Sequence, residues 1–270
     1  MPDITKRHAH MVDDPLRTNP LLKSIRKMVH KGDVVADIGA GLGILSIEAA
    51  RAGAKKIYAI ECDPEAAREL RSRLARASLG EKIEVIEAIS FEVELPQKAD
   101  VVLCETVGSF AFDENILAIL LDAEKNLLQK GGKILPQRLE LWGALAENLE
   151  GPDEESFILE ITPDLLVSAP VLIASVDFQE TFCDFIHEIS SFSCTKDAEV
   201  GTIALWPKVL WCDGEATDAS PEKPATHWKQ GMLRLEKKRM TAGEAAKVEI
   251  FIGPHPDDPL AMTERLWRWR

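Results

Sequence analysis

Two acidic side chains and a run of glycines are the residues of this sequence whose types and spacing could do chemistry. Glu105 and Glu114 lie nine positions apart and flank a loop that contains Gly108. Two carboxylates can hold one guanidinium group, because its five N–H donors lie in a plane and can be bound from two sides. On spacing alone, Glu114 could equally be a first-turn glutamate of the following helix, where negative charge is favoured. The pair predicts a site for a flat cation if both side chains face the same space.

The glycines form the segment Asp37-Ile-Gly39-Ala-Gly41-Leu-Gly43, between a predicted strand and a predicted helix. Glycines let the backbone turn sharply and come close to a ligand, and the start of a helix offers unpaired N–H groups. Asp37 either caps the loop amides or lies beneath the ligand and orders the loop, and the two interpretations are compatible. Glu61 ends the next predicted strand about 20 residues later, where an acid can bind both ribose hydroxyls. These features predict a nucleoside-containing cofactor.

The spacing of the glycines separates two classes of cofactor. A dinucleotide site has the pattern GxGxxG. Its third glycine would fall at position 44 or 46, and these positions hold Ile44 and Ser46. The pattern DxGxGxG instead resembles motif I of class I S-adenosylmethionine methyltransferases, so we expect S-adenosylmethionine. An enzyme that methylates cytosine or adenine would carry an Asn/Asp-Pro-Pro-Tyr/Phe loop after the fourth strand, and this sequence has none there.

The elements that must position these residues alternate between strand and helix in the first half of the chain. Apolar runs predict strands over 33–38, 56–60, 83–86, 101–104 and 133–135. Helical periodicity predicts helices over 44–51, 64–78 and 114–130. Asp63 is the expected N-cap of the second helix, with Pro64 at its first position. This alternation predicts a Rossmann-like α/β fold, a parallel sheet with helices on both faces.

Beyond about residue 136 the pattern changes to β-rich segments separated by turns, without regular helices between them. These segments are 138–146, 171–178, 202–211, 232–237 and 247–252. They predict a smaller, mostly antiparallel β domain. We expect domains at 1–136 and 137–270, with a short insert near 147–170 that is either a surface excursion or a short helical segment.

Composition narrows the classes of partner. The chain has 270 residues, with 32 Lys and Arg against 45 Asp and Glu, for a net charge of −13. This charge disfavours nucleic acid and anionic membranes as partners, because both need a basic surface. The sequence has neither an apolar run long enough to span a bilayer nor the apolar core of a signal peptide. Five cysteines without a CxxC pair fit reduced thiols in a cytoplasmic protein better than disulfides, and they predict no metal site.

Several separated segments, in order along the chain, resemble the protein arginine N-methyltransferase family. The matching segments are His8-Ala-His-Met11-Val-Asp-Asp-Pro-Leu-Arg17-Thr, the glycine segment and its helix, Glu61, the loop from Glu105 to Glu114, and Thr226-His227-Trp228. The family's first segment reads HxxMLxDxxRT, and its last is the THW loop of a β-barrel. The resemblance therefore implies that the β-rich half is barrel-like.

The resemblance also implies a role for each matching residue. His8, Met11 and Arg17 would contact S-adenosylmethionine, with Arg17 reaching its carboxylate. Asp37, Gly39, Gly41, Gly43 and Glu61 would form the rest of the cofactor site, and Ser90, after the third strand, would lie at the adenine. Glu105 and Glu114 would bind the arginine to be methylated, and His227 would help to organise the two glutamates.

The function that these observations favour is S-adenosylmethionine-dependent methylation of an arginine nitrogen in a protein or peptide. Two alternatives stay open on the sequence. The acceptor could be a small guanidino or amine metabolite, or the chain could bind the cofactor and serve as a non-catalytic scaffold. The resemblance further implies a possible homodimer, since the family forms ring dimers.

Overall fold

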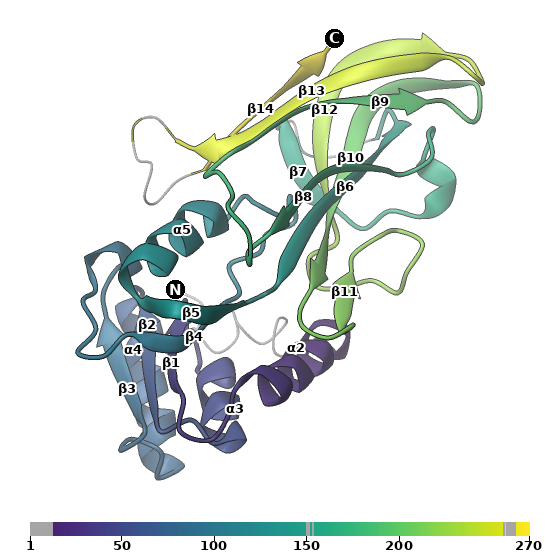
Figure 1. Ribbon diagram of the computed structural model, residues 1–270. Coiled ribbons are helices and arrows are strands. Elements are labelled where there is room, and N and C mark those ends of the chain that lie inside the picture. Colours follow the sequence, from purple (N-terminus) through teal and green to yellow (C-terminus); the bar gives the residue numbers. More distant parts are fainter. Residues whose placement is uncertain (1–12, 150–151, 153, 256, 258–262) are drawn as a thin grey trace.

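The computed structural model describes residues 13–149, 152, 154–255, 257 and 263–270. A parallel sheet with helices forms one part of the molecule, and antiparallel strands form the other (Figure 1). The expected Rossmann-like fold followed by an antiparallel β part is therefore confirmed. His8 and Met11 lie outside the described residues.

The parallel sheet has five strands in the order β3-β2-β1-β4-β5. Their bounds are β1 Val34–Ile38, β2 Lys56–Glu61, β3 Ile83–Glu87, β4 Ala99–Cys104 and β5 Leu128–Leu135. Every residue of β1 is buried, as expected for a central strand of a sheet covered on both faces. The order reverses beside β1, because β2 lies on one side of it and β4 on the other. Ligands of open α/β sheets bind at this reversal, beyond the carboxyl ends of the strands.

Four α-helices belong to the described part of the chain: α2 Pro15–Met28, α3 Ile44–Ala52, α4 Pro64–Arg76 and α5 Ile116–Asn126. The Asp63 carboxylate accepts hydrogen bonds from the N–H groups of Glu65 and Ala66, so the predicted N-cap of α4 is confirmed. The sequence pattern did not predict α2, which lies against β11 of the antiparallel part (Figure 1). None of the helices among the described residues is long and apolar enough to cross a membrane.

The predicted helix over 114–130 was too long at both ends. Asn115 has a left-handed backbone, with φ of 61°, and α5 begins after it. Glu114 therefore precedes the helix and is not one of its first-turn residues. Leu127 is the C-cap of α5, and Leu128 already starts β5, which the sequence pattern placed at 133–135. Leu127 and Leu128 are both buried, and the sequence pattern of a short apolar run does not distinguish a buried helix end from a buried strand.

The antiparallel part consists of two sheets. The six-stranded sheet has the order β7-β12-β10-β6-β8, with β11 paired to β10, and the three-stranded sheet has the order β14-β13-β9. The bounds are β6 Arg138–Glu147, β7 Ser156–Leu159, β8 Val171–Asp177, β9 Ile186–Ser193, β10 Ala198–Leu210, β11 Ala216–Asp218, β12 Gln230–Met240, β13 Ala245–Pro254 and β14 Thr263–Trp269. One apolar core of buried side chains includes residues of both parts of the molecule.

The segment 147–170 is neither a simple surface excursion nor an α-helical insert among its described residues. It contains β7 and a short 3-10 helix over Pro163–Leu165. Strand β7 pairs with β12, with Phe157 opposite Met232, and Phe157 is buried. The part of this segment that forms β7 thus belongs to the six-stranded sheet.

Candidate active site

The loop after β1 and the loop after β4 meet where the strand order reverses. Gly39 follows β1, and a Cβ atom built on it would lie 3.2 Å from the Cγ2 atom of Thr106, which follows β4. Gly39, Gly41 and Gly43 all have positive φ angles, of 70°, 53° and 81°. Residues other than glycine rarely adopt this backbone conformation, so the loop requires glycine at these three positions.

Glu61 holds the glycine loop from the end of β2. Its Oε2 accepts a hydrogen bond from the Gly41 N–H at 2.7 Å, and its Oε1 accepts one from the Asp63 N–H at 2.8 Å. The N–H groups of Gly39 and Ala40 donate to the Ile60 carbonyl. The acid predicted to bind the ribose thus lies directly against the loop predicted to bind the rest of the cofactor.

Asp37 lies beneath this loop and is fully buried. The Ser46 hydroxyl donates to its Oδ2 at 2.5 Å, whereas its Oδ1 has no hydrogen-bond partner among the residues that the structure describes. Burial raises the pKa of Asp37 to about 6, although the hydrogen bonds from Ser46 oppose that rise. A buried carboxylate oxygen without a partner is costly and marks a site that warrants a functional explanation.

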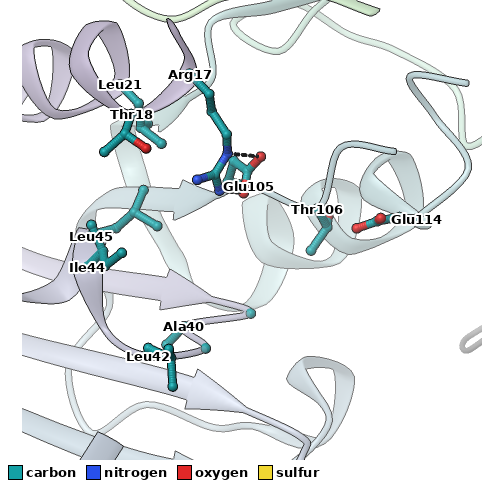
Figure 2. Close-up of a pocket in the computed structure, with 12 residues that line it drawn as sticks. Arg17, Thr18, Leu21, Ala40, Leu42, Ile44, Leu45, Glu105, Thr106 and Glu114 are labelled. Atoms are coloured by element: carbon teal, nitrogen blue, oxygen red, sulfur yellow. Dashed lines mark hydrogen bonds and ion pairs between the residues drawn. The ribbon is translucent and has the colours of Figure 1, made fainter. Parts of the chain in front are cut away.

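Two cavities adjoin the glycine loop. One, of about 170 Å³, has Arg17, Gly39, Gly41, Glu105 and Glu114 in its wall. Figure 2 shows the side chains around this cavity. The other, of about 300 Å³, is lined by Ser90 and by apolar residues such as Ile38, Ile60 and Phe91. Gly39, Thr106 and Glu114 line both cavities, so together they form a continuous site with a polar half and a largely apolar half.

Arg17 and Glu105 form a two-pronged ion pair in the polar half. The Arg17 Nε lies 2.8 Å from the Glu105 Oε1, and the Nη2 atom contacts Oε2. Both side chains are about 8% exposed, so this pair is shielded from water. Burial lowers the pKa of Arg17 to about 10, while the charges of Asp14 and Glu114 act in the opposite direction. Glu105 is thus placed and oriented to bind a guanidinium group.

Glu114 reaches the same cavity from the other end of the loop. In Figure 2 its carboxylate points towards Thr106, which stands between it and Glu105. The side chain of Glu114 is exposed to solvent, yet the protein around it still desolvates its carboxylate. Desolvation and the charge of Asp113 raise the pKa of Glu114 to about 7, and Arg17 limits the rise.

A third cavity is lined by Glu105, Glu114, His227 and Trp228 among others. The Trp228 Nε1–H donates to the Val107 carbonyl at 2.6 Å, and the Ser109 hydroxyl donates to the Trp228 carbonyl at 2.6 Å. These bonds join the β12 end of the antiparallel part to the loop that carries both glutamates. Both glutamates therefore line the polar half of the first site and this third cavity.

His227, which was expected to help organise the two glutamates, lines the third cavity with them and also contacts Asp14. Its backbone N–H and its Nδ1 lie 2.9 Å and 3.0 Å from the Oδ2 of Asp14. Asp14 is the N-cap of α2, the helix that carries Arg17. Burial would raise the pKa of Asp14, but the hydrogen bonds from His227, Leu16 and Arg17 outweigh it and lower the pKa.

The structure brings most of the predicted residues together. Arg17, Gly39, Gly41, Glu105 and Glu114 share one cavity, Ser90 lines the adjoining one, and His227 lines the third. Asp37 and Glu61 lie buried behind the loop, and Gly43 is the N-cap of α3, packed against Leu70.

Sequence reasoning assigned no role to Asp14 or Trp228. Their signals were an Asp directly before a Pro, as at a helix start, and a Trp that immediately follows the candidate histidine.

Comparisons with known proteins agree with this architecture. A family model described as ribosomal protein L11 methyltransferase (PrmA) matches residues 17–136. Protein arginine N-methyltransferase 6 of Danio rerio is 27% identical over 93% of this chain and 82% of its own length. A probable histone-arginine methyltransferase CARM1 of Oryza sativa subsp. indica is 29% identical over 96% of this chain and 57% of its own length.

Solved structures match over nearly the whole chain. The Trypanosoma brucei PRMT1 enzyme–prozyme complex with AdoHcy superposes with a TM-score of 0.84 at 21% identity, covering 98% of each chain. Protein arginine methyltransferase 10 of Arabidopsis thaliana gives a TM-score of 0.83 at 16% identity, covering 98% of this chain and 97% of its own. These similarities establish a fold shared over both parts of the molecule.

Proposed function

We infer that this chain, a homologue of the protein arginine N-methyltransferases, is a class I S-adenosylmethionine-dependent methyltransferase that methylates arginine side chains of proteins. The observation that carries the proposal is the position of Glu105 and Glu114 in the wall shared by two cavities. A guanidinium entering from the third cavity would meet both carboxylates directly beside the cofactor site. Arg17 already shows that Glu105 can bind a guanidinium through two parallel contacts.

The residues around the glycine loop fit S-adenosylmethionine. The glycines of the loop carry no side chains and let its backbone come close to a ligand, and Ser90 lies in the largely apolar cavity that suits adenine. Glu61 would take the ribose, and Arg17 would reach the carboxylate of the amino-acid end. Bound S-adenosylmethionine supplies a methyl group on a positively charged sulfur.

The two glutamates would do the chemistry that the chain itself contributes. Held by two carboxylates, the guanidinium keeps its charge on the nitrogens that do not react, while the attacking nitrogen lies beside Glu114 and faces the cofactor cavity. Fixing two reactants in a near-attack geometry can lower a barrier by roughly 7–11 kcal/mol. The attacking nitrogen must lose a proton, and Glu114, with a pKa of about 7, is well matched to accept it.

Finer assignments belong to the same proposal. We place the domain boundary at residues 136–137, between the last parallel strand and β6. We propose a cytoplasmic location, supported by five cysteines that are all free in the structure. We also propose a homodimer, and we note that the Trypanosoma brucei relative is described as a heterotetrameric complex.

The experiment compares the wild-type protein with Glu105→Gln and Glu114→Gln, using radiolabelled S-adenosylmethionine and an arginine-rich peptide. We expect label in the peptide with the wild type, loss of most of that activity in each variant, and cofactor binding by calorimetry that survives both changes. A parallel reaction with free arginine and small guanidines tests the metabolite alternative. Cofactor binding without transfer to any acceptor would favour the scaffold alternative, and unchanged turnover in both variants would end the arginine proposal.

A further inference from the structure

An ion pair between Asp113 and Arg265 lies beside the two glutamates. Asp113 directly precedes Glu114 and lines the third cavity together with both glutamates. Its Oδ1 accepts a hydrogen bond from the Phe110 N–H at 3.1 Å, and its Oδ2 lies 3.4 Å from the Nη1 of Arg265. Gly108 leaves the space that this carboxylate occupies, because a Cβ atom built there would lie 2.2 Å from the Asp113 Oδ1. Asp113 is therefore packed into the loop.

Arg265 belongs to β14, far from the loop in sequence. Alternate residues of a strand point to the same face, so Arg265 shares a face with Trp267 and Trp269. The indole N–H groups of these tryptophans donate to the carbonyls of Arg234 and Glu236 in β12, at 2.5 Å and 2.8 Å. This face of β14 is thus anchored on β12, and Arg265 extends from an anchored strand.

The guanidinium of Arg265 touches three places at once. It pairs with Asp113, lies over the ring of Phe110 with 4.6 Å between the guanidinium carbon and the ring centroid, and donates to the Ser156 hydroxyl of β7 at 3.3 Å. Two of these contacts are on the loop between the glutamates. A cation over an aromatic face and beside a carboxylate is held in position by both.

We propose that Arg265 is a positioning residue that fixes the 105–114 loop so that Glu114 faces the third cavity, which we call the acceptor cavity because the arginine substrate would enter there. The proposal rests on the function proposed above. Its partner Asp113 lines the third cavity and neither of the two cavities at the glycine loop, so the effect of Arg265 falls on the acceptor side of the site. The pKa of Asp113 gives support, because burial raises it and Arg265 counteracts the rise.

The test is steady-state methylation of an arginine-rich peptide by the full chain carrying Arg265→Met, Arg265→Lys or Arg268→Met. Arg268 is the matched control, since it lies on the same strand but pairs with Glu249 on the opposite face. We expect Arg265→Met to lower kcat/KM by roughly 10- to 100-fold, as loop misplacement does, mainly through the peptide KM. Arg265→Lys should recover part of this loss, and the Kd for S-adenosylhomocysteine should be unchanged in all three variants.

A double change separates positioning from general destabilisation. If Arg265 acts through Asp113, then Asp113→Asn should cost activity in the wild type and little more in Arg265→Met. Thermal melting identifies any variant that fails to fold, in which case Arg265→Lys and Asp113→Asn carry the test. Suppose that the wild type is active. The positioning role alone is then overturned if Arg265→Met leaves the peptide KM unchanged, or if Arg268→Met changes it by the same factor. An inactive wild type that binds cofactor overturns the proposed function and this role with it.

Discussion

Glu114 and Glu105 carry the same carboxylate, but they lie in different surroundings. Glu105 is paired with Arg17, whereas the pKa of Glu114 is raised to about 7 by desolvation and by Asp113. A guanidinium stays protonated throughout the working pH range, so binding it requires that Glu114 be ionised. We expect kcat/KM to fall as the pH drops through about 7, and Glu114→Gln to retain weak activity without this acidic limb. The measurement is the pH profile of peptide methylation for both proteins.

The stability of the protein gives an independent check on the same residue. An acid whose folded pKa lies above its ordinary value of 4.5 costs stability once the pH rises through the folded pKa. Glu114→Gln should therefore raise the melting temperature of the free protein at pH 8 and leave it unchanged near pH 4.5. An equal shift at both pH values would show that the pKa of Glu114 is not raised.

Among the elements, α2 links the cofactor site to the antiparallel part, and Asp14 makes one of these links. Asp14 caps the helix with hydrogen bonds from the N–H groups of Leu16 and Arg17, and it also binds His227. Asp14→Ser keeps a capping oxygen but is too short to reach His227. We expect it to lower the free energy of unfolding by about 1–3 kcal/mol, the loss of charge-assisted hydrogen bonds. Asp14→Ala should cost about 1 kcal/mol more, because it also removes the cap.

The experiment is urea unfolding of the three proteins at pH 7 and pH 3. The pKa of Asp14 is lowered from 3.8, so its stabilisation is present at neutral pH and is lost as the pH falls through the folded pKa. The differences between the variants should shrink at pH 3. A Ser variant as stable as the wild type at pH 7 would mean that the His227 contact contributes nothing.

At the scale of the whole molecule, the parallel half was predictable from sequence because its signals are local. Glycines, caps and buried apolar runs fix where β1, β2 and α4 begin and end, and the family resemblance supplied the cofactor. The helix α2 was missed because its stability comes from packing against other elements, with Leu21, Ile25 and Met28 buried, and Pro20 interrupts its pattern. Contacts across the fold, such as those of Trp228 and Arg265, join residues more than a hundred positions apart and leave no periodic signal.

The contact of Trp228 with the 105–114 loop tests whether the two parts of the molecule act together. Trp228→Phe keeps the buried aromatic ring but removes the N–H that donates to the Val107 carbonyl, at a cost of about 1–3 kcal/mol for an unpaired buried acceptor. Trp211→Phe is the matched control, since Trp211 is also buried and its indole donates to Thr217, away from the loop. We expect both variants to lose stability in urea, but only Trp228→Phe to raise the peptide KM, with the affinity for S-adenosylhomocysteine unchanged. If the two variants had the same peptide KM, the geometry of the acceptor cavity would not depend on the bond between Trp228 and Val107. The loop would then hold its glutamates in place without the antiparallel part.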